Sequence, residues 1–252
     1  MRSLCCLSWV VLVLVGATGP LDAADNTPPP GFVALFNGKN FDGWKVPEGD
    51  NGHWKVVNGV IDYDARSEAK GDKNLWTTKS YKDFVLLIDW RIKETPFVNP
   101  NVPVILPDGT HKKGPDGKEL RQAIPDSDSG IFLRGSPKSQ VNIWCWPVGS
   151  GEVYGYRMDA KMPAEVRAGV TPKKKADRPI GEWNTFEITV KGDRLWVKLN
   201  GEEVITNAQL PGIPAEGPIG LQHHGSFDAK SGKWTGPPSL VQFRNIYIKE
   251  LK

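Results

Sequence analysis

Short runs of β-branched and aromatic residues, separated by Gly, Pro, Asn or Asp, occupy most of the chain beyond its N-terminal region. Runs of this kind are typical of β-strands joined by turns. No amphipathic helical period longer than about two turns competes with them. The pattern therefore predicts an all-β fold, a two-sheet jelly-roll sandwich. The expected strands lie at residues 32–36, 54–57, 60–63, 83–92, 130–134, 141–144, 185–190, 194–199, 202–205, 219–224 and 240–249.

Two turns in the C-terminal third carry the residues that tight hairpins require. Lys191-Gly192-Asp193 and Asn200-Gly201 each separate two strand runs. Glycine and asparagine adopt the positive φ angles that close antiparallel strands, so a meander is expected there. The segment 94–126 is instead rich in proline and polar residues. A loop of that length inside a compact domain is usually functional or mobile.

The N-terminus has the three parts of a secretory signal peptide. Arg2 supplies the positive charge, residues 7–15 are apolar, and Ala23-Ala24 offers small residues for cleavage. The apolar run is too short to span a bilayer, and no later segment is apolar enough to do so. We expect a secreted or periplasmic protein with no membrane span. Its expected parts are a signal peptide at 1–24, a flexible leader at 25–31 and a single jelly-roll domain at 32–252.

Composition narrows the classes of partner and cofactor. The 32 basic and 29 acidic residues leave a formal net charge of +3, and the one dense basic run is Lys173-Lys174-Lys175. That run, between two prolines, is typical of a solvated loop, so no nucleic-acid partner is expected. Cys145 is the only cysteine outside the signal peptide, which excludes an internal disulfide from the mature chain. No nucleotide-binding or paired-cysteine zinc motif is present.

The strand expected around residues 140–146 carries an unusual alternation. One face would carry the amides and indoles of Gln140, Asn142, Trp144 and Trp146, and the other the small apolar residues Val141, Ile143 and Cys145. Amides exchange hydrogen bonds with pairs of hydroxyl groups, and an indole ring packs on the apolar face of a pyranose. The face therefore predicts a carbohydrate-binding groove. The alternative is that Trp144 and Trp146 belong to the core and the amides face plain solvent.

The same two-residue alternation places residues of other strands in the candidate groove. Asp89 and Arg91 share one face of their strand, Arg134 ends another, and Gln222 and His224 share a face of a third. An acid–arginine pair such as Asp89 and Arg91 is equally compatible with a solvated surface pair. Segment 152–159 follows a glycine-rich turn and forms either a return hairpin or a rim of the groove. The candidate groove residues are thus Asp89, Arg91, Arg134, Gln140, Asn142, Trp144, Glu152, Tyr156, Gln222 and His224.

Four motifs, in their order and spacing, resemble the 3-keto-disaccharide hydrolase domain family. They are the opening residues 32–44, Asp128-Ser129-Gly130-Ile131-Phe132-Leu133-Arg134-Gly135, Gly181-Glu182-Trp183-Asn184, and Leu221-Gln222-His223-His224-Gly225 with the closing residues 243–246. The resemblance spans nearly the whole mature chain. It implies a concanavalin A-like jelly roll that acts on sugars outside the cytoplasm. Members of that family often carry a glutamate in the strand after the Ser-Gly-Ile-Phe motif, where this chain has Gln140-Val141-Asn142.

The resemblance also implies a substrate already oxidised at C3 of one sugar. A 3-keto group acidifies the C2 proton, so a base removes it, the C1 aglycone leaves by elimination, and water adds back. Such a site needs a base, a group that stabilises the enediolate oxygen, and an acid. Histidine titrates near neutral pH, which makes His224 the expected base or acid. Arg134 or a divalent cation, calcium by the preference of oxygen ligands, would hold the oxyanion, with Asp89 orienting His224 or binding the cation.

Two other functions fit the residues. A glycoside hydrolase with two carboxylates would use Asp89 with Glu152. A non-catalytic carbohydrate-binding module would need only the aromatic and amide face. A register slip of one residue would place His223 rather than His224 in the groove.

Overall fold

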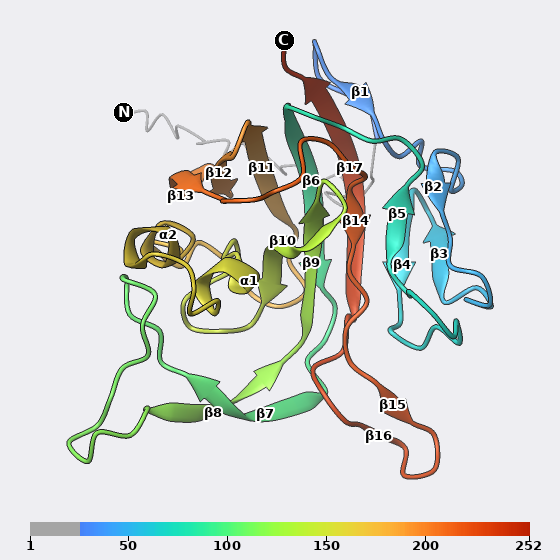
Figure 1. Ribbon diagram of the computed structural model, residues 1–252. Helices are drawn as coiled ribbons and strands as arrows, with labels where there is room; N and C mark the ends of the chain where they lie inside the picture. Colours follow the sequence, from blue (N-terminus) through green and yellow to red (C-terminus); the bar gives the residue numbers. More distant parts are fainter. Residues whose placement is uncertain (1–25) are drawn as a thin grey trace, which may run out of the picture.

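The computed structural model describes residues 26–252, so the expected signal peptide lies outside the described residues. Two antiparallel sheets form the sandwich, which confirms the jelly-roll prediction (Figure 1). The larger sheet has the order β13-β12-β11-β6-β17-β4-β3, with β1 paired to β17. Its strands are β1 (Val33–Ala34), β3 (Trp54–Val57), β4 (Val60–Tyr63), β6 (Phe84–Ile92), β11 (Asn184–Lys191), β12 (Arg194–Leu199), β13 (Glu202–Gln209) and β17 (Val241–Glu250).

The smaller sheet has the order β10-β9-β14-β5-β2 and carries the alternating strand noted in the sequence. Its strands are β2 (Trp44–Lys45), β5 (Leu75–Thr77), β9 (Asp128–Leu133), β10 (Ser136–Trp144) and β14 (Gly220–Leu221). Two short helices, α1 (Tyr154–Arg157) and α2 (Ala164–Gly169), follow β10. Segment 152–159, for which a return hairpin was one expectation, therefore contains a helix instead.

The core lies between the inner faces of the two sheets. Along β6, every second residue from Phe84 to Ile92 is buried, as the two-residue period of a strand with one solvated face requires. In the smaller sheet, the inward residues include Ile131, Val141 and Ile143, all without exposed surface. The apolar half of the 140–144 alternation thus faces the larger sheet, as predicted. Its polar half faces outward.

The long segment 94–126 is ordered around a hairpin. Strands β7 (Phe97–Pro103) and β8 (Arg121–Asp126) pair with each other and project from one end of the sandwich, beside a second hairpin of β15 (Phe227–Asp228) and β16 (Lys233–Trp234) (Figure 1). Strand β8 leads directly into β9 of the smaller sheet. The hairpin therefore places its own residues next to the outer face of that sheet.

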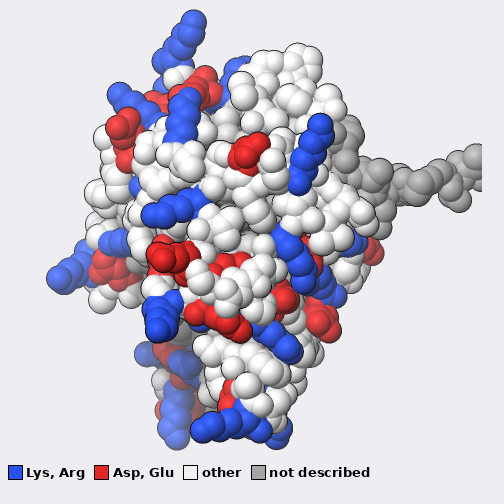
Figure 2. Space-filling view, turned by 90° about the vertical axis from the view of Figure 1, so that its right-hand side faces the viewer, with Lys and Arg blue, Asp and Glu red and all other residues white. Residues whose placement is uncertain are grey.

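Asn26, at the start of the described residues, is tied to the domain by three hydrogen bonds. Its backbone N–H donates to the Asn245 side-chain Oδ1, the Asn245 backbone N–H donates to the Asn26 Oδ1, and the Asn26 Nδ2 donates to the Gly59 carbonyl. The described part of the expected flexible leader is therefore held against the sandwich. Basic and acidic side chains are interspersed over the face in Figure 2. Among residues 26–252, none of the helices has the length and apolar character needed to cross a bilayer.

Candidate functional site

A cavity of about 390 Å³, here called the sheet pocket, lies on the outer face of the smaller sheet. Strand register explains which side chains meet there. Directly opposed residues of antiparallel strands point to the same face. Gln140 pairs with Phe132, Asn142 with Gly130, and Trp144 with Asp128. The lining residues are Asn99, Asp128, Gln140, Asn142, Trp144, Trp146, Tyr154, Gln222, His224 and Pro237.

Two amides cross the floor of the pocket because β9 carries a glycine there. A Cβ on Gly130 would collide with the side chain of Gln140. With only hydrogen at that position, the Gln140 amide reaches over β9 and donates to the Gln222 Oε1. Because that oxygen is occupied, the Nε2 group of Gln222 remains as a donor for a ligand. The glycine of the Ser-Gly-Ile-Phe motif is therefore needed because any larger residue would block the contact between Gln140 and Gln222.

Asn142 provides a further amide to the pocket. Asn142 is only 3% exposed. Its backbone N–H donates to the Glu152 carbonyl at 2.9 Å, which joins β10 to the segment after the next turn. Its side-chain amide makes no hydrogen bond to another residue of the described chain. The amide lines the cavity, so it is available to exchange hydrogen bonds with a hydroxyl-bearing ligand.

Three aromatic rings form one wall. Trp144 stacks on Trp146 with ring centroids 4.2 Å apart and planes 3° from parallel, and Tyr154 contacts Trp144 edge-on at 6.2 Å. Trp144 is 3% exposed, whereas Tyr154 is 42% exposed and Trp146 is intermediate. The sequence placed Trp144 on the correct face. The ring surfaces available to a sugar are nevertheless mainly those of Trp146 and Tyr154.

Asp128 and His224 are the titratable groups of the pocket. Burial raises the pKa of Asp128 to about 7, although nearby His224 lowers it, and the charge of Asp126 adds to the rise. The Nδ1 atom of His224 lies 2.7 Å from the Pro237 carbonyl, which only accepts, so Nδ1 carries the hydrogen. The Nε2 atom is then the ring nitrogen left to accept a proton. The pocket therefore contains both this nitrogen and a carboxyl group whose pKa is raised to about 7.

Asp126, at the end of β8, supports this wall from behind. Its carboxylate accepts hydrogen bonds from the Asn99 amide at 2.9 Å and from the Trp146 indole N–H at 3.0 Å. Burial raises the pKa of Asp126, whereas these hydrogen bonds lower it. The β7–β8 hairpin thus fixes the orientation of Trp146 and contributes Asn99 to the pocket.

The prediction that Asp89 and Arg91 line this groove is wrong. Both lie on β6 of the larger sheet, on its outer face, away from the smaller sheet. Asp89 accepts hydrogen bonds from Thr185 at 2.6 Å and Asn245 at 2.9 Å. Arg91 donates to Gln242 at 2.7 Å. The two-residue alternation correctly predicted that the two side chains share a face, but that face belongs to the larger sheet.

Arg134 is also outside the pocket. It follows β9 with a φ of +51°, so it no longer continues the strand alternation. The buried guanidinium pairs with Asp83 at 2.7 Å and donates to the carbonyls of Lys82, Gly192 and Pro214. The Nε, Nη1 and Nη2 atoms of Arg134 thus all donate hydrogen bonds within the protein. An oxyanion-binding role for Arg134 is therefore not supported by its position.

Glu152, just before α1, and Tyr156, within α1, are buried and do not rim the groove. Glu152 is fully buried and forms an ion pair with Arg157, which also donates to His111 at 2.9 Å. Tyr156 is 1% exposed. Because Asp89 and Glu152 belong to different regions, the pair expected of a two-carboxylate hydrolase does not form.

His223 and His224 face different cavities, as the unslipped register predicts. The Tyr63 hydroxyl lies 2.7 Å from the Nδ1 of His223, and burial lowers the pKa of His223 to about 4. Its cavity, which His53 and Arg66 also line, is separate from the sheet pocket. No group of three or more His, Cys, Asp or Glu residues suited to a metal occurs in the described part of the chain. A calcium requirement remains a prediction.

Of the pocket residues, the sequence pattern placed Trp146 on the same face as Trp144, but it did not predict Asp128, Tyr154, Asn99 or Pro237. Asp128 could have been predicted, because it directly precedes the Ser-Gly-Ile-Phe motif and shares a face with Phe132. Tyr154 could not have been predicted from strand alternation, because its exposure depends on a helix. Asn99 reaches the pocket through a hairpin inside a segment that reads as a loop.

The jelly-roll sandwich and its amide-lined, aromatic-walled pocket define a β-sandwich domain of the carbohydrate-active kind. The model of the 3-keto-alpha-glucoside-1,2-lyase-like domain matches residues 31–249, and the chain belongs to that family. This confirms the resemblance carried by the four motifs.

Solved structures show the same fold. Two proteins from Parabacteroides distasonis, provisionally described as glycosyl hydrolases, are similar to this chain. One has a TM-score of 0.56 at 20% identity, covering 88% of this chain and 85% of its own. The other has a TM-score of 0.53 at 21% identity, covering 88% and 95%. The search of curated proteins gave no match.

Proposed function

We propose that the protein cleaves the glycosidic bond of 3-keto-disaccharides and related 3-keto-glycosides by elimination followed by hydration. The observation that carries this proposal is the pairing of Asp128 with His224 in one pocket beside amide donors. Carboxyl groups whose pKa is raised by burial cluster at catalytic sites, and burial raises the pKa of Asp128 to about 7. The family to which the chain belongs supports the same chemistry.

In the first step, the Nε2 atom of His224 removes the C2 proton of the 3-keto sugar. The electron pair of that C–H bond moves into a C2–C3 double bond, and the C3 oxygen becomes an enolate. The side-chain N–H groups of Asn142 and Gln222 are available to donate to that oxygen. Donors already fixed in place stabilise charge that develops in the transition state.

In the second step, the enolate returns to a ketone and a C1–C2 double bond forms. The C1–O bond breaks, its electron pair leaves with the aglycone oxygen, and Asp128 gives that oxygen its proton. Water then adds at C1, passing a proton to Asp128, while protonated His224, whose N–H has exchanged with solvent, returns a proton to C2. Both groups regain their starting states. The products are the 3-keto sugar and the free aglycone.

The proposed roles revise the catalytic set expected from the sequence. Asp128 replaces Asp89 as the acid partner of His224, and the amides replace Arg134 as the oxyanion donors. Trp146 and Tyr154 would stack on the sugar or on its aglycone. Calcium binding remains a prediction, and the assay below tests it with a chelator.

The test is an assay of the mature protein on 3-keto and unoxidised disaccharides, each with and without chelator, with released monosaccharide as the readout. Release from the 3-keto substrate alone supports the proposal. Release from the unoxidised substrate would favour ordinary glycoside hydrolysis. Binding without any release would favour a carbohydrate-binding module. Loss of activity with chelator, restored by Ca²⁺, would support the calcium prediction.

A further inference from the structure

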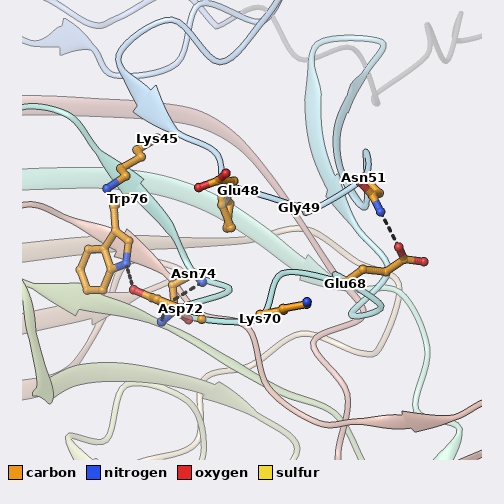
Figure 3. A pocket seen from close by; sticks show the side chains of 11 residues that line it. Lys45, Glu48, Gly49, Asn51, Glu68, Lys70, Asp72, Asn74 and Trp76 are labelled. Atoms are coloured by element: carbon orange, nitrogen blue, oxygen red, sulfur yellow. Dashed lines mark hydrogen bonds between the residues drawn. The ribbon is translucent and has the colours of Figure 1, made fainter.

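A second cavity, of about 750 Å³, lies at the opposite edge of the smaller sheet (Figure 3). We call it the edge cavity. It is separate from the sheet pocket, with which it shares no lining residue. The edge cavity is lined by Lys45, Pro47, Glu48, Gly49, Asn51, Glu68, Lys70, Gly71, Asp72, Asn74 and Trp76.

One rung of the smaller sheet connects the two cavities. Lys45 pairs with Trp76, Trp76 with Gly220, Gly220 with Phe132, and Phe132 with Gln140. Opposed residues share a face, so all five positions lie on the outer side of the sheet. Gln140 lines the sheet pocket, while Trp76 and Lys45 line the edge cavity. Three strand spacings separate Gln140 from Trp76, roughly 14 Å, a span longer than one sugar ring.

Trp76 is a fixed aromatic surface at the cavity wall. Its indole N–H donates to the Asp72 carboxylate at 2.6 Å, and its ring stacks on Phe132 with centroids 5.3 Å apart and planes 18° from parallel. The ring also covers Gly220, where an added Cβ would lie 2.6 Å from it. Trp76 is only partly buried. A ring already held in place binds a ligand without a further loss of side-chain entropy.

The rest of the lining is polar and mixed in charge. The lining includes two lysines, three carboxylates and the amides of Asn51 and Asn74. In Figure 3 the Trp76 ring stands at one end of the cavity, and Asn51 and Glu68 stand at the other. A strongly anionic or cationic ligand would meet like charges here. An aromatic plane ringed by donors and acceptors suits a neutral polyhydroxylated ligand.

We propose that the edge cavity is a distal subsite, in which a neutral sugar residue of an oligosaccharide substrate stacks on Trp76. The proposal rests on the proposed function in placing the reacting end of that substrate in the sheet pocket. The intervening residues of the oligosaccharide pass over the Phe132 rung. The protein then selects longer saccharides over disaccharides through contacts remote from the cleaved bond.

The test is calorimetric titration of the mature protein with unoxidised α-linked gluco-oligosaccharides, from disaccharide to hexasaccharide. Affinity should rise with chain length once one molecule reaches both cavities. Trp76→Ala should weaken binding of the long oligosaccharides about tenfold and leave disaccharide binding unchanged. Trp76→Phe, which keeps an aromatic plane, should retain most of the gain. Trp183→Ala is the matched control, because Trp183 lies against Arg91 and Arg244 of the larger sheet.

Affinity that does not depend on chain length would overturn the proposal, as would equal losses for short and long saccharides in Trp76→Ala. Thermal unfolding monitors the fold of each variant. If Trp76→Ala does not fold, Lys45→Ala supplies the test, since Lys45 is exposed at the end of the same rung; a length-dependent loss is again expected. Binding is measured without cleavage, so a failure of the proposed reaction and a failure of the subsite give different results.

Discussion

At the scale of single residues, Asp128 and His224 differ in what their surroundings allow. Burial raises the pKa of the Asp128 carboxyl to about 7, so this group carries its proton below that pH. The His224 ring has its Nδ1–H directed to a carbonyl, which leaves Nε2 as the acceptor. One pocket thus offers a carboxylic acid and a ring nitrogen that accepts a proton, the two groups that an elimination requires.

Replacing Asp128 by Asn should lower kcat on a 3-keto-disaccharide about a hundredfold or more and change substrate affinity far less. In the wild-type protein, an acid must be protonated to act, and the pKa of Asp128 is raised to about 7. Activity should therefore be highest below that value and fall as the pH rises through about 7. Steady-state kinetics across this pH range measure both effects. A wild-type rate that increases through about 7 would contradict the acid role.

The two adjacent histidines provide a matched pair of variants. His224→Ala should lower turnover about a hundredfold or more, because it removes the proposed base. His223→Ala should leave the chemistry largely intact and reduce stability, since His223 contacts Tyr63 in a separate cavity. Turnover and thermal unfolding are measured on both variants. Full activity in His224→Ala would refute the assignment, and full activity in both would remove histidine from the mechanism.

At the scale of elements, β10 and the turn after it divide the two tryptophans between core and ligand surface. Trp144 ends the strand and is buried beneath Trp146, with its indole N–H donating to the Gly149 carbonyl at 2.7 Å. Trp146 is held by Asp126 of the adjoining hairpin. Stacking lets one ring support the other.

Accordingly, Trp144→Ala should destabilise the fold by about 3–5 kcal/mol, the usual cost of removing a buried large aromatic side chain. Trp146→Ala should cost less stability and weaken sugar binding by roughly 1 kcal/mol or more. Urea unfolding and sugar titration of both variants separate these effects. The assignment of the binding surface to Trp146 fails if Trp144→Ala remains stable and alone loses sugar affinity.

The alternation of side chains predicted some elements of the site and not others, for a physical reason. A two-residue period shows which side chains share a face of one strand, and it placed Gln140 and Asn142 correctly. His224 also reaches the pocket, although the strand expected at 219–224 ends at Leu221. It does not show to which sheet a strand belongs, so Asp89 was assigned to the wrong one. It also fails where the backbone leaves the strand, as at Arg134 with its positive φ and at Tyr156 in α1.

At the scale of the whole molecule, the sandwich supplies a rigid floor and the irregular segments complete the pocket. The smaller sheet contributes the amides, Asp128 and the buried Trp144, whereas the β7–β8 hairpin and α1 contribute Asn99 and Tyr154. The two-sheet fold follows from the many short apolar strands, which the sequence displays directly. The contacts of a hairpin within a proline-rich segment arise only from its docking, and local sequence carries little signal for them.

Export is the prediction that concerns the whole chain. The positive Arg2, the short apolar run and Ala23-Ala24 predict cleavage near Asp25. Mass spectrometry of the protein recovered from its native source should therefore show a chain that begins near Asp25. A product that retains Met1 would contradict both signal-peptide removal and the proposed site of action outside the cytoplasm.

Removal of the C2 proton distinguishes the proposed reaction from ordinary glycoside hydrolysis, and solvent deuterium reports on it. When the mature protein cleaves a 3-keto-disaccharide in D₂O, hydration of the C1–C2 double bond should place deuterium at C2 of the released 3-keto sugar. A sample of that sugar without protein corrects for spontaneous exchange. We expect enzyme-dependent deuterium at C2 in each turnover, whereas a product that retains hydrogen at C2 would mean that the bond is cleaved without removal of the C2 proton.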